Sequence, residues 1–245
     1  MTNAAEVGDV VLDLASMEAA EPAQVLDGLV DAAERLFGLT AGAALLSDGA
    51  VRGVVASGPR RPRDALSAGF GQGPGGECAR SGNPVLCTDL SRERHRWLAF
   101  VAKATAAGIS AAWALPVRRE AAGFGALLLL GERDSVPDLR AAGVLAEAAA
   151  VGILRANERE HAAHETRQLR AALESRVTVE QAKGILAAHA RIDVGTAFEQ
   201  LRTYARRRGR SLTELASAVV HGEIAPDTIL EARGKAAGAR RGEAG

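Results

Sequence analysis

The sequence predicts an α+β domain built on an antiparallel sheet, followed by an all-α three-helix bundle. Strand-like and helical runs alternate through residues 1–154, which hold most of the glycines, whereas residues 155–245 show helical periodicity and one proline, Pro226. The sign of the net charge changes at the same place. Residues 1–154 carry 14 basic and 18 acidic side chains, whereas residues 155–245 carry 16 basic and 12 acidic ones. Pattern and charge therefore both divide the chain near Leu154.

The composition excludes some classes of protein. The chain has 30 Lys and Arg against 30 Asp and Glu, which excludes a uniformly basic nucleic-acid binder but not a basic C-terminal part. Its 27 arginines, 3 lysines and 52 alanines are typical of GC-rich codon usage, so the arginine count alone says little about nucleic acid. The five scattered histidines belong to no Ser/His/Asp order or paired acid set, so we expect no catalytic residues and no enzyme.

The elements of the first part follow from periodicity and turn residues. Residues 22–37 have the apolar spacing of an amphipathic helix that ends at Gly38. Two strands at 43–47 and 51–55 flank Asp48-Gly49, a dipeptide suited to a tight hairpin turn. We then expect a glycine-rich loop and a series of short elements. The loop is 69–76, the helices are 77–81, 97–107 and 139–154, and the strands are 84–88, 111–117 and 125–130.

The glycine-rich stretch could bind phosphate at the N-terminus of the following helix. No Gly-Lys-Ser/Thr follows it, however, and Pro74 lacks an amide hydrogen. We interpret it as a structural turn and not as a catalytic signal.

The second part predicts three helices. Residues 156–189 form an almost uninterrupted helical pattern that continues the preceding helix, and its apolar positions include Leu169, Leu173 and Val177. Asp193 is a suitable N-cap for a second helix, which Arg207-Arg208-Gly209-Arg210 ends. Ser211 and Glu214 match the capping box of a third helix that ends near Gly222.

These patterns predict four regions: an α+β domain at 14–154, a helical linker at 155–167, a bundle at 168–222 and a flexible tail at 223–245. No signal peptide or membrane-length apolar run is present, so we expect a cytoplasmic protein without membrane contact. Cys78 and Cys87 lack partners with metal-ligand spacing, so we expect no metal. Two interpretations of these cysteines stay open: they are small buried residues, or they are redox sensors.

The first part resembles a GAF domain of the bacterial sensory kind, over roughly residues 14–154. The resemblance implies a sheet with flanking helices and a central pocket that takes a small-molecule effector in some relatives; the pocket residues and the effector are unknown. The matching segments, in order, are Gly73-Pro74-Gly75-Gly76-Glu77-Cys78-Ala79-Arg80-Ser81-Gly82-Asn83-Pro84-Val85, Asp89-Leu90-Ser91, Arg96-Trp97, Phe100, Gly108, Pro116-Val117 and Gly125-Ala126-Leu127.

The second part resembles an ANTAR domain over roughly residues 168–222. Relatives bind paired RNA hairpins in nascent transcripts and prevent transcription termination, commonly as dimers. The resemblance therefore implies a homodimeric antitermination regulator controlled by the GAF-like domain. The matching segments are Leu173-Glu174-Ser175-Arg176, Val179-Glu180-Gln181-Ala182-Lys183-Gly184-Ile185-Leu186, Ala197-Phe198, Leu201-Arg202, Ala205 and residues 212–219.

Six side chains of the bundle are our candidates for RNA contact, since residues 167–225 carry ten basic and six acidic side chains. On this hypothesis Lys183→Ala and Arg202→Ala weaken RNA binding and leave the thermal midpoint nearly unchanged. Tyr204 is a candidate for base stacking, and Gly184 allows either close approach of RNA or helix packing. The six are Arg176, Gln181 and Lys183 on the first bundle helix and Arg202, Arg206 and Arg207 on the second.

Two other interpretations stay open. Glu180–Lys183 and Glu199–Arg202 have the spacing of ordinary helix-surface pairs, and the arginines at 207–210 suit a solvated turn. The chain could then be a dimerising protein-interaction module without sequence-specific RNA binding. A regular Leu-rich heptad is absent from the long helix, so such a dimer depends on packing of small residues.

Overall fold

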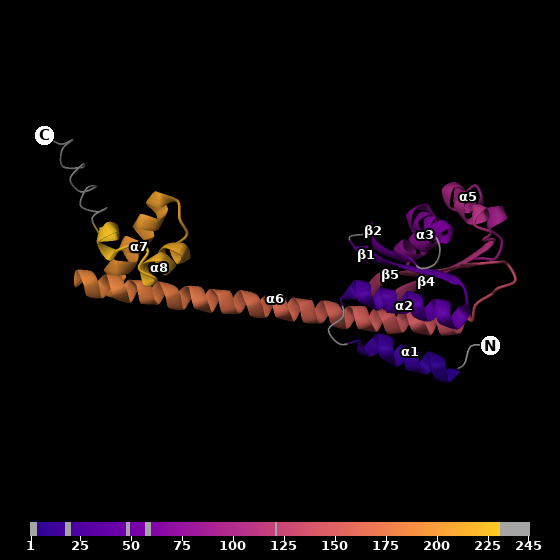
Figure 1. Cartoon of the computed structure of the whole chain (residues 1–245), viewed down its shortest axis with the longest axis horizontal. Coiled ribbons are helices and arrows are strands. Elements are labelled where there is room, and N and C mark those ends of the chain that lie inside the picture. The colour runs from indigo at the N-terminus through magenta and orange to yellow at the C-terminus, as the bar shows by residue number, and fades with distance from the viewer. Residues whose placement is uncertain (1–3, 18–20, 48–49, 57–59, 121, 231–245) are drawn as a thin grey trace. The chain divides into compact units, whose positions relative to one another are not determined.

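The computed structural model describes residues 4–17, 21–47, 50–56, 60–120 and 122–230. The chain divides into two compact units, Met1–His161 and Ala162–Gly245, and the long helix α6 (Leu139–Ala190) begins in the first and ends in the second (Figure 1). Each unit has a hydrophobic core of its own.

The first unit contains a five-stranded antiparallel sheet, which confirms the predicted fold class. Its strand order is β2-β1-β5-β4-β3. The predicted hairpin is β1 and β2, although its turn residues Asp48 and Gly49 lie outside the described residues. The last two strands are longer than expected, because they pair with each other as far as Arg119 and Ala122. The strands are β1 (Thr40–Ser47), β2 (Ala50–Ala56), β3 (Val85–Cys87), β4 (Ala111–Arg119) and β5 (Ala122–Gly131).

Alternate side chains of the strands enter two different cores, as the two-residue period of a strand requires. On β5, Leu127 and Leu129 join one cluster and Leu128 and Leu130 join the other. The first face is covered by α2 (Pro22–Phe37) and the start of α6, and the second by α3 (Arg60–Gln72), α4 (Pro74–Ser81) and α5 (Leu98–Ala106) (Figure 1). A sheet covered on both faces explains why its strands are almost continuously apolar.

The structure adds a helix that the sequence analysis did not anticipate, α1 (Ala4–Ser16). It buries Val10 and Leu14 in the same core as α2 and α6. A Cβ added at Gly152 of α6 would lie 2.5 Å from the Leu14 carbonyl oxygen, so a side chain there would push α1 away. Arg155 Nη1 donates to the Ala15 carbonyl oxygen at 2.6 Å, which satisfies one of the free carbonyls at the helix end.

The prediction of a glycine-rich loop at 69–76 is wrong. Helix α3 continues to Gln72 and α4 begins at Pro74, with only Gly73 between them. These glycines allow close contact: a Cβ on Gly73 would lie 2.6 Å from the Gly69 Cα, and one on Gly76 would lie 2.3 Å from the Phe70 carbonyl oxygen. Local propensity disfavours glycine in a helix, but tight packing of α3 on α4 requires it here.

The second unit is the predicted three-helix bundle, made of the end of α6, α7 (Val194–Arg208) and α8 (Leu212–Val220). Both predicted caps are present. The Asp193 carboxylate accepts from the Thr196 amide, and Ser211 and Glu214 form the reciprocal capping box. The core residues come from all three helices and from the segment that follows them. They are Ala182, Leu186, Ala187, Ala197, Leu201, Tyr204, Ala205, Leu215, Ala216, Val219 and Ile229.

The segment after α8 corrects the predicted start of the flexible tail at residue 223. Residues 226–230 are helical, and Ile229 is buried in the bundle core. His189 Nε2 lies 2.7 Å from Asp227 Oδ1, which fastens this segment to the end of α6. The burial of Ile229 stabilises the helical conformation of residues 226–230. Residues 231–245 of the predicted tail lie outside the described residues.

Candidate nucleic-acid interface

The candidate RNA contacts lie on α6 and α7, and five of the six are well exposed. Arg176 and Gln181 on α6 are exposed, as are Arg202, Arg206 and Arg207 on α7. Lys183 differs from these five, because its side chain is only 16% exposed.

The Lys183 ammonium contacts two other side chains of the bundle. Lys183 Nζ lies 2.9 Å from both carboxylate oxygens of Glu180 and 5.4 Å from the centre of the Phe198 ring. The predicted helix-surface pair with Glu180 is therefore confirmed, and the cation also joins α6 to α7. These contacts argue against the expectation that Lys183→Ala leaves the thermal midpoint unchanged.

The three candidate arginines of α7 lie on two neighbouring stripes of the helix. Arg202 and Arg206 are one turn apart, and Arg202 Nη1 lies 3.7 Å from Glu199 Oε1, which confirms the second predicted surface pair. Both partners are exposed, so this pair contributes little to folding. Arg207 lies on the next stripe and lines a groove. The guanidinium groups are thus presented on the outside of the bundle.

Not every candidate on α6 faces the same way. Arg176 and Lys183 are seven residues apart and share one side of the helix, whereas Gln181 stands two residues before Lys183 and faces another side. A Cβ added at Gly184 would meet nothing within 4 Å. Packing among the described residues therefore gives no reason for glycine at 184, and close approach of RNA stays a prediction.

A groove of about 640 Å³ runs along α7, and the sequence analysis did not find it. Thr196, Gln200, Thr203 and Arg207 line it at spacings of four, three and four residues, so they form one continuous polar stripe. The buried Ile229 lines it from outside α7. The spacing of these polar residues was a usable sequence signal.

Tyr204 also lines the groove, but it cannot offer a whole ring face to a base. Its side chain is 7% exposed and belongs to the bundle core. The Arg208 guanidinium carbon lies 5.5 Å from its ring centre. The structure therefore corrects the expectation that Tyr204 stacks as an exposed aromatic ring.

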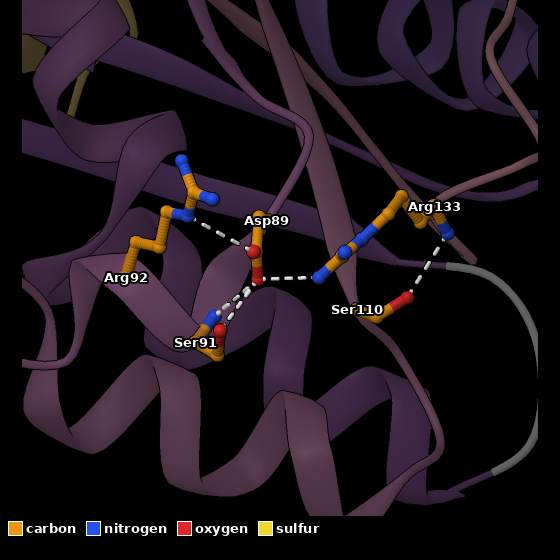
Figure 2. A network of polar contacts seen from close by, with 5 residues as sticks. All are labelled: Asp89, Ser91, Arg92, Ser110 and Arg133. Atoms are coloured by element: carbon orange, nitrogen blue, oxygen red, sulfur yellow. Dashed lines mark hydrogen bonds and ion pairs between the residues drawn. The ribbon is translucent and has the colours of Figure 1, made fainter.

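The first unit holds a polar cluster at one end of its sheet (Figure 2). Asp89 Oδ1 accepts from the hydroxyl and the amide of Ser91 and pairs with Arg133 Nη2 at 2.7 Å, while Oδ2 lies 3.3 Å from Arg92 Nε. The Ser91 hydroxyl bond, followed by the Ser91 amide and the two guanidinium groups, holds the pKa of Asp89 below its usual range. The Arg133 amide donates to Ser110 Oγ at 3.0 Å. The cluster joins the chain after β3 to the start of β4 and the end of β5.

Both cysteines are buried in the core on the second face of the sheet. Burial raises the pKa of Cys78 to about 12 and also raises the pKa of Cys87. A buried thiol with a raised pKa is a poor nucleophile, which favours packing over redox sensing.

Two kinds of feature are absent from the part of the chain that the structure describes. No group of three or more His, Cys, Asp or Glu side chains is placed to hold a metal ion there. None of the helices in that part is both long and apolar enough to span a membrane.

The chain thus consists of an antiparallel-sheet domain with a core on each face of the sheet, followed by a capped three-helix bundle. The family comparisons agree: the GAF domain model matches residues 19–154 and the ANTAR domain model matches residues 167–220. The chain belongs to the GAF domain family and carries an ANTAR domain after the GAF domain. The ANTAR domain supports RNA as the kind of partner.

Several solved structures are similar to the chain. The GAF domain from Acinetobacter phosphoenolpyruvate-protein phosphotransferase is 14% identical, with a TM-score of 0.47, and the match covers 64% of this chain and 97% of that one. Free methionine-R-sulfoxide reductase from Neisseria meningitidis is 16% identical, with a TM-score of 0.45, and the match covers 66% of this chain and 96% of that one. The bacteriophytochrome RpBphP3 from R. palustris is 13% identical, with a TM-score of 0.49, and the match covers 81% of this chain and 46% of that one. At these values the likenesses carry no argument about function. No curated protein matches the sequence.

Proposed function

We propose that this chain is a transcription antitermination regulator that binds RNA hairpins through its ANTAR domain under the control of its GAF domain. The observation that carries the proposal is the match of the ANTAR family to residues 167–220, which coincide with the bundle that exposes Arg202, Arg206 and Arg207 on one helix. Guanidinium groups pair with phosphates and stack on unpaired bases. In this proposal the chain binds RNA and performs no catalytic step, and action on nascent transcripts places it in the cytoplasm.

The GAF domain is proposed to control the bundle in response to an effector that is not identified. Helix α6 belongs to both units, so it is the covalent route by which a change in the GAF domain can reach the bundle. A transmitter of this kind predicts that a proline in the middle of α6 uncouples RNA binding from the effector, because proline breaks a helix.

We further propose that the chain acts as a homodimer, with the second copy on an exposed stripe of α6. Leu169, Leu173 and Val177 are 67%, 63% and 56% exposed and recur every four residues along one side of the helix. Large apolar side chains in such a row indicate a partner surface. A second copy of this helix presents the same row, so the two rows can bury each other around a twofold axis.

The oligomeric state of the full chain tests this second proposal. Analytical ultracentrifugation of the protein is expected to give a dimer, and the double variant Leu169→Glu/Leu173→Glu is expected to give a monomer. Leu98→Glu is the matched control, because Leu98 is 74% exposed on α5 of the GAF domain. A monomeric wild type, or a double variant that stays dimeric, contradicts the proposal.

RNA binding is tested by gel shift with an RNA that carries two hairpins, in parallel with a DNA of the same sequence. We expect tighter binding of the RNA, and a weaker complex with Arg202→Ala/Arg206→Ala. Each lost phosphate contact should flatten the dependence of log K on log salt by roughly 0.7 to 0.9. Arg140→Ala removes an exposed arginine outside the bundle and serves as the control. Equal weak binding of RNA and DNA instead indicates a dimerising interaction module with a basic surface.

A further inference from the structure

Helix α1 lies outside the residues that the GAF domain model matches, which begin at residue 19. Its attachment to the first unit is thin, because α1 buries two side chains, Val10 and Leu14, whereas α2 buries six. A cleft of about 290 Å³ remains between α1 and α2. An element with few buried side chains opens locally at low free energy, so α1 can detach while the core beneath it stays folded.

The C-terminal end of α1 depends on side chains of α6. Its last turn has no basic residue and contains Asp13, whose charge is unfavourable at that end of the helix dipole. Arg155 Nη1 supplies positive charge and donates to the Ala15 carbonyl oxygen at 2.6 Å. Arg159 Nη2 donates in the same way to the Met17 carbonyl oxygen at 3.2 Å. A helix of thirteen residues is marginal on its own, so α1 stays helical only while α6 holds it.

Helix α6 depends on α1 in turn, at Gly152. Glycine in a helix interior weakens the helix, because its backbone is more flexible than that of any other residue. The Leu14 carbonyl of α1 and the Val25 side chain of α2 cover this glycine, since a Cβ on it would lie 2.5 Å from the first and 3.0 Å from the second. Gly152, Arg155 and Arg159 are spaced by three and four residues, so α1 contacts one stripe of α6.

From these contacts we propose that α1 is a clasp that controls a hinge in α6 at Gly152. While α1 is docked, α6 is rigid across Gly152, and when α1 is released, α6 bends there. The inference rests on the proposed function, in which α6 connects the GAF domain to the bundle, and it supplies the two-state element that such a route requires. The proposed dimer holds two copies of α6 side by side, and a bend in each disturbs that arrangement. Release of α1 therefore weakens RNA binding.

Hydrogen exchange measured by mass spectrometry on the full chain tests the clasp. The variant Arg155→Met/Arg159→Met removes both guanidinium groups. We expect α1 in this variant to exchange about tenfold faster than in the wild type or more, residues 153–159 of α6 to lose protection, and α2 to keep its protection. Arg140→Met is the matched control, because Arg140 is an exposed arginine at the start of α6.

Gly152→Ala separates the clasp from the hinge. The new Cβ meets the Leu14 carbonyl oxygen, so α1 should be released, but alanine strengthens α6 at the same point. Arg155→Met/Arg159→Met should bind the two-hairpin RNA about fivefold more weakly than the wild type or more, the lower end of the usual coupling between sites. Addition of Gly152→Ala to that variant should restore the affinity although α1 stays released, and a role of the arginines in folding alone gives no such rescue.

Four results count against these expectations. Full protection of α1 in Arg155→Met/Arg159→Met overturns the clasp. A released α1 with unchanged protection of residues 153–159, or with unchanged RNA affinity, overturns the hinge. An affinity that Gly152→Ala does not restore overturns Gly152 as its position. If the wild type binds no RNA, the proposed function fails, while the exchange of α1 and α6 still decides whether the clasp exists.

Discussion

Replacement of Lys183 by alanine separates a structural role of this lysine from a role in RNA contact. The ammonium pairs with both oxygens of Glu180 at 2.9 Å and lies over the Phe198 ring at 5.4 Å. Because Glu180 is 56% exposed, its pair with Lys183 counts as one at the protein surface, which contributes about 0.2–1 kcal/mol, and a cation–π contact contributes about 0.5–1 kcal/mol. The substitution should therefore cost about 1–2 kcal/mol of folding free energy, because the side chain is only 16% exposed.

For a unit of this size such a loss lowers the midpoint of thermal unfolding by roughly 5–15 °C. The assay is circular dichroism at 222 nm on the full chain, with RNA affinity measured at a temperature where both proteins are folded. Arg202→Ala is the control, since its pair with Glu199 is exposed at 3.7 Å and its loss should move the midpoint only slightly. An unchanged midpoint for Lys183→Ala refutes the reasoning, whatever the effect on RNA.

Three further predictions concern the GAF domain. Gly76→Ala should destabilise the protein by about 1–3 kcal/mol in urea unfolding, because the new Cβ would meet the Phe70 carbonyl oxygen; wild-type stability would exclude the packing explanation. With its pKa raised to about 12, Cys78 should resist a thiol reagent at pH 8 until denaturant is added, and rapid labelling of native protein would reopen redox sensing. Because the folded pKa of Asp89 is lowered, its stabilisation is present above the ordinary value of 3.8 and is lost as the pH falls below it. The difference in thermal midpoint between wild type and Asp89→Asn should therefore shrink from pH 7 to pH 3, and a constant difference counts against the pairing with Ser91.

Capping residues and periodicity were enough to predict the bundle. Asp193, Ser211 and Glu214 satisfy backbone groups within one turn of themselves, so their roles are visible in local sequence. The alternation of strands and helices likewise predicts the sheet. The expected exposure of the arginines on α7 follows from the same periodicity.

The features that the sequence analysis missed depend on contacts between distant residues. Gly76 permits the approach of α4 to Phe70, and nothing next to it in the sequence indicates that helix contact. Helix α1 is fastened by Arg155, which is 140 residues from the carbonyl that it binds. The α7 groove needs Ile229 as a wall, and that residue lies in a segment expected to be flexible.

The central claim is that RNA binding by the bundle prevents termination, and read-through during transcription in vitro measures it directly. The template places a terminator so that its stem overlaps the second of two hairpins. The account predicts that the full chain raises the fraction of read-through transcripts, that Arg140→Ala does the same, and that Arg202→Ala/Arg206→Ala does not. Read-through that stays at the level of the protein-free reaction, on a template whose RNA the protein binds, would contradict the account.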